Sequence, residues 1–242
     1  MTAPPLDLRP ARQREGLSVS ATGLGMEYPT AAGTVRALDE VSVRFPAGTS
    51  TAIVGASGCG KSTLLGLLAG LERPTTGQVR VGDRVISALS ERERVLLRRR
   101  SFGLIFQADN LQPYLTAAEN VALQAVLAGL PEDRGRVKAL LDCLAVGTLG
   151  HRFPDQLSGG ERQRVAVARA LVHHPRVVFA DEPTGSLDAR SSERVVDLLL
   201  DASRQVGATL LIVTHDRSVA ARADRTVEMR DGSVPAGQDA PT

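Results

Sequence analysis

The chain has 242 residues, of which 43% are hydrophobic, and its formal net charge is +2 at pH 7. This length fits one large domain or two lobes, and the apolar fraction is ample for a core. The charge is too small to indicate a nucleic-acid partner, and two cysteines give no disulfide framework and fit a reducing cytosol.

The two ends of the chain are polar and rich in proline, glycine or charge. Residues 1–16 lack the apolar segment of a secretory signal, and no uninterrupted apolar run approaches the ~18 residues that cross a membrane. We therefore expect tails over residues 1–16 and 233–242, around one domain over residues 17–232. Within that domain, β-rich segments near residues 17–25, 36–44 and 78–86 predict an antiparallel layer.

A phosphate-binding loop is predicted early in the domain. Residues 55–62 read GASGCGKS and fit G-x-x-x-x-G-K-[ST], between β-rich residues 51–54 and helix-forming residues 63–69. The glycines let successive N–H groups point into one concavity, and the helix N-terminus favours phosphate oxygens. Lys61 is expected to reach the β- and γ-phosphates and Ser62 a magnesium ion; the alternative is a plain glycine-rich turn. The expected nucleotide ligands are Gly55, Ala56, Ser57, Gly58, Cys59, Gly60, Lys61, Ser62 and Thr63.

The two cysteines have different settings. Cys143 is expected in the core on a helix. Cys59 lies inside the phosphate loop, where N–H dipoles and Lys61 favour a thiolate. We therefore expect alkylation of Cys59 that bound ATP blocks.

Helices alternate with apolar strands in the rest of the chain. Ser90 with Glu93 and Thr116 with Glu119 have capping-box spacing, and Pro131 suits the start of a helix over residues 131–145. The run 98–100 is three arginines and is interpreted as a solvated helix end. Parallel strands are expected to end at Val54, Phe106, Asp181 and Thr214. Residues 107–176 are thus predicted to form a helical lobe inserted into an α/β core, with ligand at the carboxyl ends of the strands.

Two acids follow the apolar strand at residues 177–180, which read VVFA. Asp181 and Glu182 point to opposite faces of the strand, so they cannot do the same job. Asp181 is suited to hold magnesium near Ser62, and Glu182 to orient or deprotonate an attacking water. The alternative is a strand end with solvated acids.

Residues 157–161 read LSGGE. Ser158 and Glu161 form a capping box at the start of a helix through about Val172, and Gly159 and Gly160 leave its first N–H groups accessible. With the phosphate loop and the acid pair, this segment resembles the signature of ATP-binding cassette (ABC) transporters. The chain is similar to a nucleotide-binding subunit of that family over about residues 17–232. Glu161 stands where the family often has glutamine.

The resemblance implies a fold and a ligand set. The fold is α/β, a P-loop NTPase core with a mainly parallel sheet, an antiparallel β subdomain and an inserted α-helical subdomain over about residues 107–176. The ligands are ATP and Mg²⁺. The helix start at Ser158, Gly159, Gly160 and Glu161 would bind the γ-phosphate of a nucleotide held by a second copy, so that ATP is sandwiched in a homodimer.

Other roles follow from the same resemblance. Gln107 matches the glutamine that senses magnesium and the attacking water, and His215 matches the switch histidine that contacts the γ-phosphate and positions Glu182. Residues 186–188, with Asp188, match a loop that crosses the dimer interface, and Tyr28 matches an aromatic residue against adenine. Each of these two residues also has a simpler alternative. A histidine after a strand is usually just a loop residue, and an aromatic residue in a strand region, such as Tyr28, is often a packing residue. The implied catalytic residues are Lys61, Gln107, Glu182 and His215, and the implied metal ligands are Ser62, Gln107 and Asp181.

One subgroup is resembled most closely, through residues 74–79, 115–123, 157–171 and 180–188. It is the macrolide-exporter, lipoprotein-releasing and cell-division type. This implies an ATPase at the cytoplasmic face of the plasma membrane that powers a separate integral membrane permease, in export or force transmission. The alternatives are an importer-type subunit, as in amino-acid uptake, a soluble ABC ATPase acting on DNA or ribosomes, and a nucleotide-gated binding module without turnover.

A docking segment for the permease is also implied by the family. Residues 108–123 follow Gln107, and in the family the corresponding groove receives a cytoplasmic coupling helix. Leu111, Pro113 and Tyr114 are the apolar candidates for that contact. The alternative is a simple connector.

Overall fold

The computed structural model describes residues 15–31, 33–185 and 187–235, so most of both predicted tails lies outside the described residues. A central five-stranded sheet has the order β6–β7–β8–β3–β9, and every neighbouring pair in it is parallel. Four of these strands were predicted, whereas β9 was not. Their bounds are β3 Ser50–Val54, β6 Phe102–Ile105, β7 Val177–Asp181, β8 Thr209–Val213 and β9 Arg225–Glu228.

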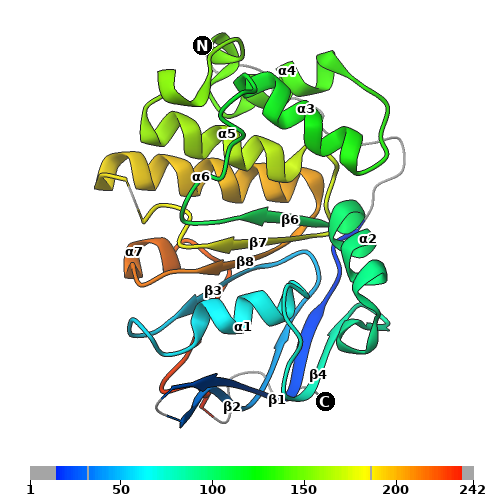
Figure 1. Ribbon diagram of the computed structural model, residues 1–242. Coiled ribbons are helices and arrows are strands. Elements are labelled where there is room, and N and C mark those ends of the chain that lie inside the picture. The colour runs from blue at the N-terminus through cyan, green and yellow to red at the C-terminus, as the bar shows by residue number, and fades with distance from the viewer. Residues whose placement is uncertain (1–14, 32, 186, 236–242) are drawn as a thin grey trace.

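An antiparallel sheet forms the second layer, as predicted. Its order is β2–β1–β4–β5, and β1 pairs with both β2 and β4. The helix α1 (Lys61–Leu68) lies between this sheet and the central one (Figure 1). The strands are β1 Val19–Thr30, β2 Gly33–Phe45, β4 Thr76–Val81 and β5 Arg84–Val85. The predicted fold class is confirmed.

Side-chain caps start most of the remaining helices. The capping boxes predicted at Ser90, Thr116 and Ser158 are all present. The helix predicted from Pro131 instead begins at Arg134, because the Asp133 carboxylate accepts the backbone N–H of Arg136. The helices are α2 Glu91–Ser101, α3 Ala117–Leu127, α4 Arg134–Cys143, α5 Gly159–Leu171, α6 Ala189–Val206 and α7 Arg217–Ala220, with 3₁₀ turns η1 Ile86–Ala88, η2 Gly147–Leu149 and η3 Pro154–Gln156.

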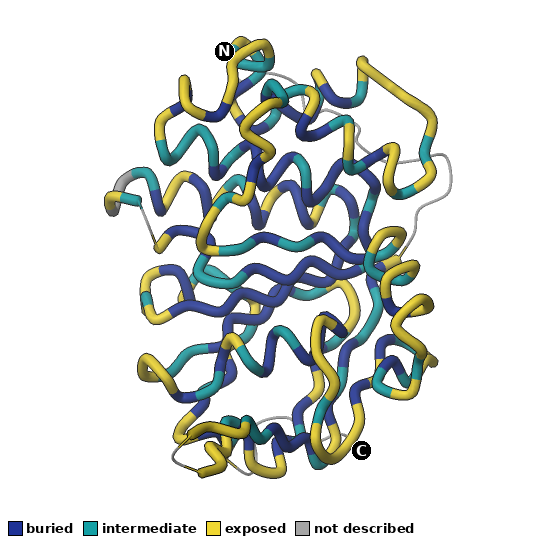
Figure 2. Tube along the Cα trace, in the orientation of Figure 1, coloured by how far each residue is buried: buried dark blue, intermediate teal, exposed yellow. Residues whose placement is uncertain are grey.

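Two apolar cores lie on opposite faces of the central sheet, whose inner strands β7, β8 and β3 are buried along most of their length (Figure 2). On β7, Val178 and Ala180 belong to the core shared with α3 to α6, whereas Val177 and Phe179 belong to the core shared with α1 and the antiparallel sheet. This is the alternation expected of a strand covered on both faces. Among the described helices, none has the length and apolarity needed to cross a bilayer.

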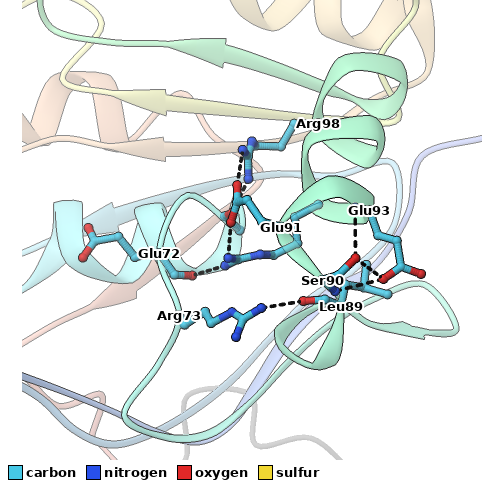
Figure 3. A network of polar contacts seen from close by, with 9 residues as sticks. Glu72, Arg73, Leu89, Ser90, Glu91, Glu93 and Arg98 are labelled. Atoms are coloured by element: carbon cyan, nitrogen blue, oxygen red, sulfur yellow. Dashed lines mark hydrogen bonds and ion pairs between the residues drawn. The ribbon is translucent and has the colours of Figure 1, made fainter.

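A polar network joins α2 to the turn after α1 (Figure 3). Glu91 accepts a hydrogen bond from Arg98 at 3.1 Å and pairs with the buried Arg94, which also donates to the Glu72 carbonyl at 3.2 Å. Arg98 is therefore only 18% exposed at its side chain. The interpretation of residues 98–100 as a solvated helix end is wrong for Arg98, because its guanidinium group also donates to the Gly70 carbonyl in the turn after α1.

Candidate active site

The phosphate loop joins β3 to α1 with backbone angles that favour glycine. Gly58 has φ 80° and Gly60 has φ 98°, both in the left-handed region. A Cβ at Gly60 would lie 2.6 Å from the carbonyl oxygen of Ala37 in β2. The loop therefore fits against the antiparallel sheet only with glycine at position 60, where it also forms the N-cap of α1.

Lys61 carries its charge into the concavity of this loop. Its side chain is buried, and its Nζ donates to the carbonyl oxygens of Gly55 at 3.0 Å and Ala56 at 2.8 Å. A cradle that holds a cationic donor among backbone N–H groups suits an anionic ligand. Cys59 is 6% exposed and packs in the core beneath the loop, with Sγ 4.0 Å from Lys61 Nζ. Its burial argues against the ready alkylation that the sequence suggested.

Ser62 and Asp181 meet at the carboxyl end of the central sheet. The Ser62 hydroxyl donates to Asp181 Oδ1 at 3.0 Å. Burial raises the pKa of Asp181, and the nearby Glu182 adds to the rise, while the Ser62 hydrogen bond and Lys61 oppose it. A half-buried carboxyl group beside a hydroxyl group is a donor set that a hard divalent cation fits, since the cation would favour the carboxylate.

Glu182 and His215 form the second polar pair at this edge. His215 Nδ1 lies 2.9 Å from Glu182 Oε1. They come together because Asp181 of β7 is paired with Val213 of β8, and the chain leaves both strands side by side. Glu182 has φ 45°, a left-handed conformation that non-glycine residues rarely adopt, and its N–H donates to the Val213 carbonyl at 3.0 Å.

One cavity of about 400 Å³ is lined by the four predicted catalytic residues and by part of the phosphate loop. Gln107 reaches it from the end of β6, and its side chain lies against Gly185 in the loop after β7. Sequence reasoning missed Ala37, which contributes from β2 and belongs to no chemical motif. The lining residues are Ala37, Ser57, Gly58, Gly60, Lys61, Ser62, Thr63, Gln107, Glu182 and His215.

Tyr28 is not among these lining residues, although its hydroxyl also contacts the side chain of Thr63, which is one of them. Its hydroxyl donates to Glu72 Oε2 at 2.8 Å, and its ring packs against the core of the antiparallel sheet. Burial, followed by the Glu72 carboxylate, raises the pKa of Tyr28. The ring thus has a packing role in this structure, and its contact with adenine stays a prediction.

The LSGGE segment is also outside the cavity lining. Ser158 N–H donates to Glu161 Oε2 at 2.7 Å, which lowers the pKa of Glu161 and closes the capping box. Leu187 would be 3.4 Å from a Cβ at Gly159, so the two segments are in contact. Asp188 caps α6 by accepting from Ser191 N–H at 3.0 Å, and Ser186 lies outside the described residues.

The family model described as ABC transporter matches residues 38–185, from β2 to the loop after β7. The chain belongs to the ABC transporter family. It is an ABC-type ATPase subunit, as the phosphate loop, acid pair and LSGGE segment indicated. The resemblance found in the sequence is confirmed.

Several relatives cover most of the chain. The lipoprotein-releasing system ATP-binding protein LolD of Xanthomonas campestris is 46% identical over 219 residues, which are 89% of this chain and 91% of LolD. The ABC transporter ATP-binding protein Rv0986 of Mycobacterium tuberculosis is 46% identical over 199 residues, 81% of this chain and 80% of Rv0986. The macrolide export ATP-binding/permease protein MacB 1/2 of Paracoccus denitrificans is 46% identical over 88% of this chain, which spans only 32% of MacB.

A solved structure has the same fold. The ATP-binding cassette MJ0796, in a dimeric post-hydrolysis state with ADP and Pi, superposes with a TM-score of 0.81 at 35% identity. The match covers 89% of this chain and 96% of that one. MJ0796 itself is described as a dimer that holds ADP and Pi, the products of ATP hydrolysis.

Proposed function

We propose that the chain is the ATP-hydrolysing subunit of an ABC system that powers a separate integral membrane permease, in export or transmembrane force transmission. The observation that carries this proposal is the Glu182–His215 pair at 2.9 Å, facing the same cavity as the phosphate loop. A carboxylate held by an imidazole beside a phosphate cradle is suited to activate water against a phosphoryl group. It has no evident use in a module that only binds nucleotide.

The phosphate loop and α1 hold the triphosphate of ATP in this proposal. Lys61 exchanges its two loop carbonyls for β- and γ-phosphate oxygens, which are better partners for an ammonium group because they are charged. The backbone of residues 55–63 supplies the N–H donors. Tyr28 would stack on the adenine after leaving part of its present packing.

Mg²⁺ fits the oxygen donors at the strand ends. Ser62, Asp181 and Gln107 are the residues that would hold it, directly or through water. When bound, the ion neutralises charge on the phosphate oxygens. Asp181 is then ionised, because the cation outweighs the effect of burial.

Hydrolysis needs one proton acceptor near the attacking water. Glu182 accepts that proton as the water oxygen bonds to the γ-phosphorus and the bond to the β–γ bridging oxygen breaks, leaving ADP and phosphate. His215 holds the Glu182 carboxylate in place through the 2.9 Å contact. Gln107, which lines the same cavity and lies against Gly185, orients the water.

A second copy completes each site in the proposed homodimer. The Ser158 helix start presents its first N–H groups outside the cavity of its own chain, which suits a γ-phosphate held by the partner. Ser158, Gly159, Gly160, Glu161 and Asp188 would make that contact. The dimeric state of MJ0796 supports this arrangement.

The permease contact is proposed at an apolar groove of about 310 Å³ between α2, α3 and α5. Phe106, Leu123 and Leu127 are among its lining residues. Tyr114 is 89% exposed on the segment that follows Gln107, whereas Leu111 is 9% exposed and therefore unsuited to the docking role expected of it. In this proposal, such a contact holds the chain at the cytoplasmic face of the inner membrane.

Export or force transmission is favoured over import by the similarity to LolD and MacB. The experiment is affinity recovery of a tagged Glu182→Gln chain from detergent-solubilised native membranes with ATP and Mg²⁺, followed by mass spectrometry. A few-span permease with a large outer domain supports the proposal. A many-span permease with a solute-binding protein supports the importer alternative, and recovery without any membrane protein supports a soluble ATPase.

A further inference from the structure

The segment that carries Gln107 is fastened to α5 by side chains of α5 itself. Arg162 Nε donates to Asp109 Oδ2 at 2.8 Å. Arg169 Nη2 donates to the Asp109 carbonyl at 2.8 Å and its Nη1 to the Asn110 carbonyl. Gln163, which is 2% exposed, donates to the Phe106 carbonyl at 3.4 Å. Residues on both sides of Gln107 are thus tied to one helix.

The same helix begins with the LSGGE segment, and Arg162 also holds that segment. Its Nη1 donates to the Leu157 carbonyl at 2.7 Å, one residue before the Ser158 cap. One guanidinium group therefore binds the segment after Gln107 through Nε and the segment before Ser158 through Nη1. A planar group with donors in fixed directions makes this a rigid link.

The Asp109–Arg162 pair is shielded enough to matter energetically. Its side chains are 27% and 35% exposed, respectively, and the carbonyl contacts of Arg169 lie beside it. Fully exposed ion pairs contribute little, because solvent screens them and their side chains lose freedom. A half-buried, hydrogen-bonded pair supported by a second arginine two helical turns away restrains its partners more strongly.

We infer that Asp109, through Arg162, is a positioning residue that couples Gln107 in one nucleotide site to the LSGGE segment that serves the other site. This inference rests on the proposed homodimer. Gln107 faces the cavity of its own chain, whereas Ser158 faces a nucleotide held by the partner. A displacement of Gln107 on nucleotide binding therefore moves Ser158 through two hydrogen bonds of one side chain, so that the two sites do not act independently.

The test compares Asp109→Asn and Asp109→Glu with the parent chain in steady-state hydrolysis of ATP with Mg²⁺. Lys138→Gln is the matched control, since it removes the Lys138–Asp142 pair of 2.6 Å on α4 of the same subdomain. We expect Asp109→Asn to bind a fluorescent ATP analogue within about twofold of the parent but to lower kcat by about five- to tenfold, with a Hill coefficient falling toward one. Asp109→Glu and Lys138→Gln should keep the parent's kcat and Hill coefficient.

Two results would overturn the inference: equal kinetics of Asp109→Asn and Lys138→Gln, or an equal loss in Asp109→Asn and Asp109→Glu, because the carboxylate would then be irrelevant. If Asp109→Asn loses its cooperative thermal transition, Asp109→Ser replaces it, since its hydroxyl can keep the local contact to Leu111 N–H.

The parent is the separate check on the proposed function. A monomeric parent without cooperativity contradicts the homodimer, whereas a cooperative parent beside an unaffected Asp109→Asn contradicts only the coupling.

Discussion

The hydroxyl of Ser62 and the carboxylate of Asp181 are joined by a hydrogen bond of 3.0 Å, although 119 positions separate them in the chain. The bond connects the first turn of α1 to the end of β7. It fixes the spacing between the phosphate loop and the strand that carries both acids. The pH dependence of the proposed cation site follows from this contact.

Mg²⁺-dependent nucleotide binding should weaken on mild acidification. Burial raises the pKa of Asp181, so protons compete with Mg²⁺ for this carboxylate at a higher pH than for an ordinary aspartate. The direction of the pH effect on folding stability also follows, because the folded state binds this proton more readily than the unfolded state does. The contribution of Asp181 to the free energy of unfolding therefore falls as pH rises through its raised pKa.

The measurement is the affinity for ATP between about pH 8 and pH 5, with and without Mg²⁺. The advantage that Mg²⁺ confers should shrink toward low pH in the parent. Asp181→Asn should show little Mg²⁺ advantage at any pH. A parent whose Mg²⁺ advantage is constant over this range would contradict the proposed ligand.

Replacement of Lys61 by alanine should abolish ATP binding or hydrolysis. Lys61 is the cationic donor inside the loop, and alanine leaves the carbonyls of Gly55 and Ala56 without it. Loss of a charge-stabilising group commonly lowers turnover by about a hundredfold or more. ATP affinity and kcat are the readouts. Lys138→Ala, on the exposed surface of α4, is the control and should match the parent.

Glu182→Gln should retain ATP and accumulate as a dimer. The amide keeps the shape of the side chain but cannot accept the proton of water, so turnover is expected to fall by at least about a hundredfold. Size-exclusion chromatography with ATP and Mg²⁺ measures the dimer fraction. Turnover at the parent rate would show that another group accepts the proton.

Tyr114→Asp should uncouple the ATPase from its permease. Tyr114 is 89% exposed, so the change should alter neither folding nor basal hydrolysis. Transport in the complete system should fall while basal ATPase activity stays within about twofold of the parent, as for surface changes in general. Leu71→Asp, at a residue 40% exposed on the turn after α1, is the control. Equal loss of both activities in Tyr114→Asp would contradict a docking role.

Local signals in the sequence predicted most of the architecture. The capping boxes at Ser90, Thr116 and Ser158 were predictable because a cap depends on residues three positions apart. The four apolar strands and the phosphate loop were equally local. The strand β9 was not predicted, because residues 225–228 read RTVE and show no apolar run. Its formation depends on pairing with β3.

Long-range packing decided what the sequence could not predict about the site. The burial of Cys59 depends on the core beneath the loop, and the place of Ala37 depends on how β2 approaches Gly60. The clamp of Arg162 and Arg169 on residues 109–110 joins groups more than fifty positions apart. Pairing of Glu182 with His215 was expected from the family, but its 2.9 Å geometry required the register of β7 against β8.

The left-handed backbone conformation of Glu182 lowers the stability of the fold, whereas the side chain of Glu182 is needed for the proposed catalysis. A side chain at φ 45° is strained by about 1–2 kcal/mol, which glycine at the same position would avoid. Glu182→Gly should therefore tend to raise the melting temperature while it removes the proposed proton acceptor. A variant library screened only for survival on heating would enrich inactive chains at this position, so stabilisation of this protein has to be selected with turnover as a second criterion.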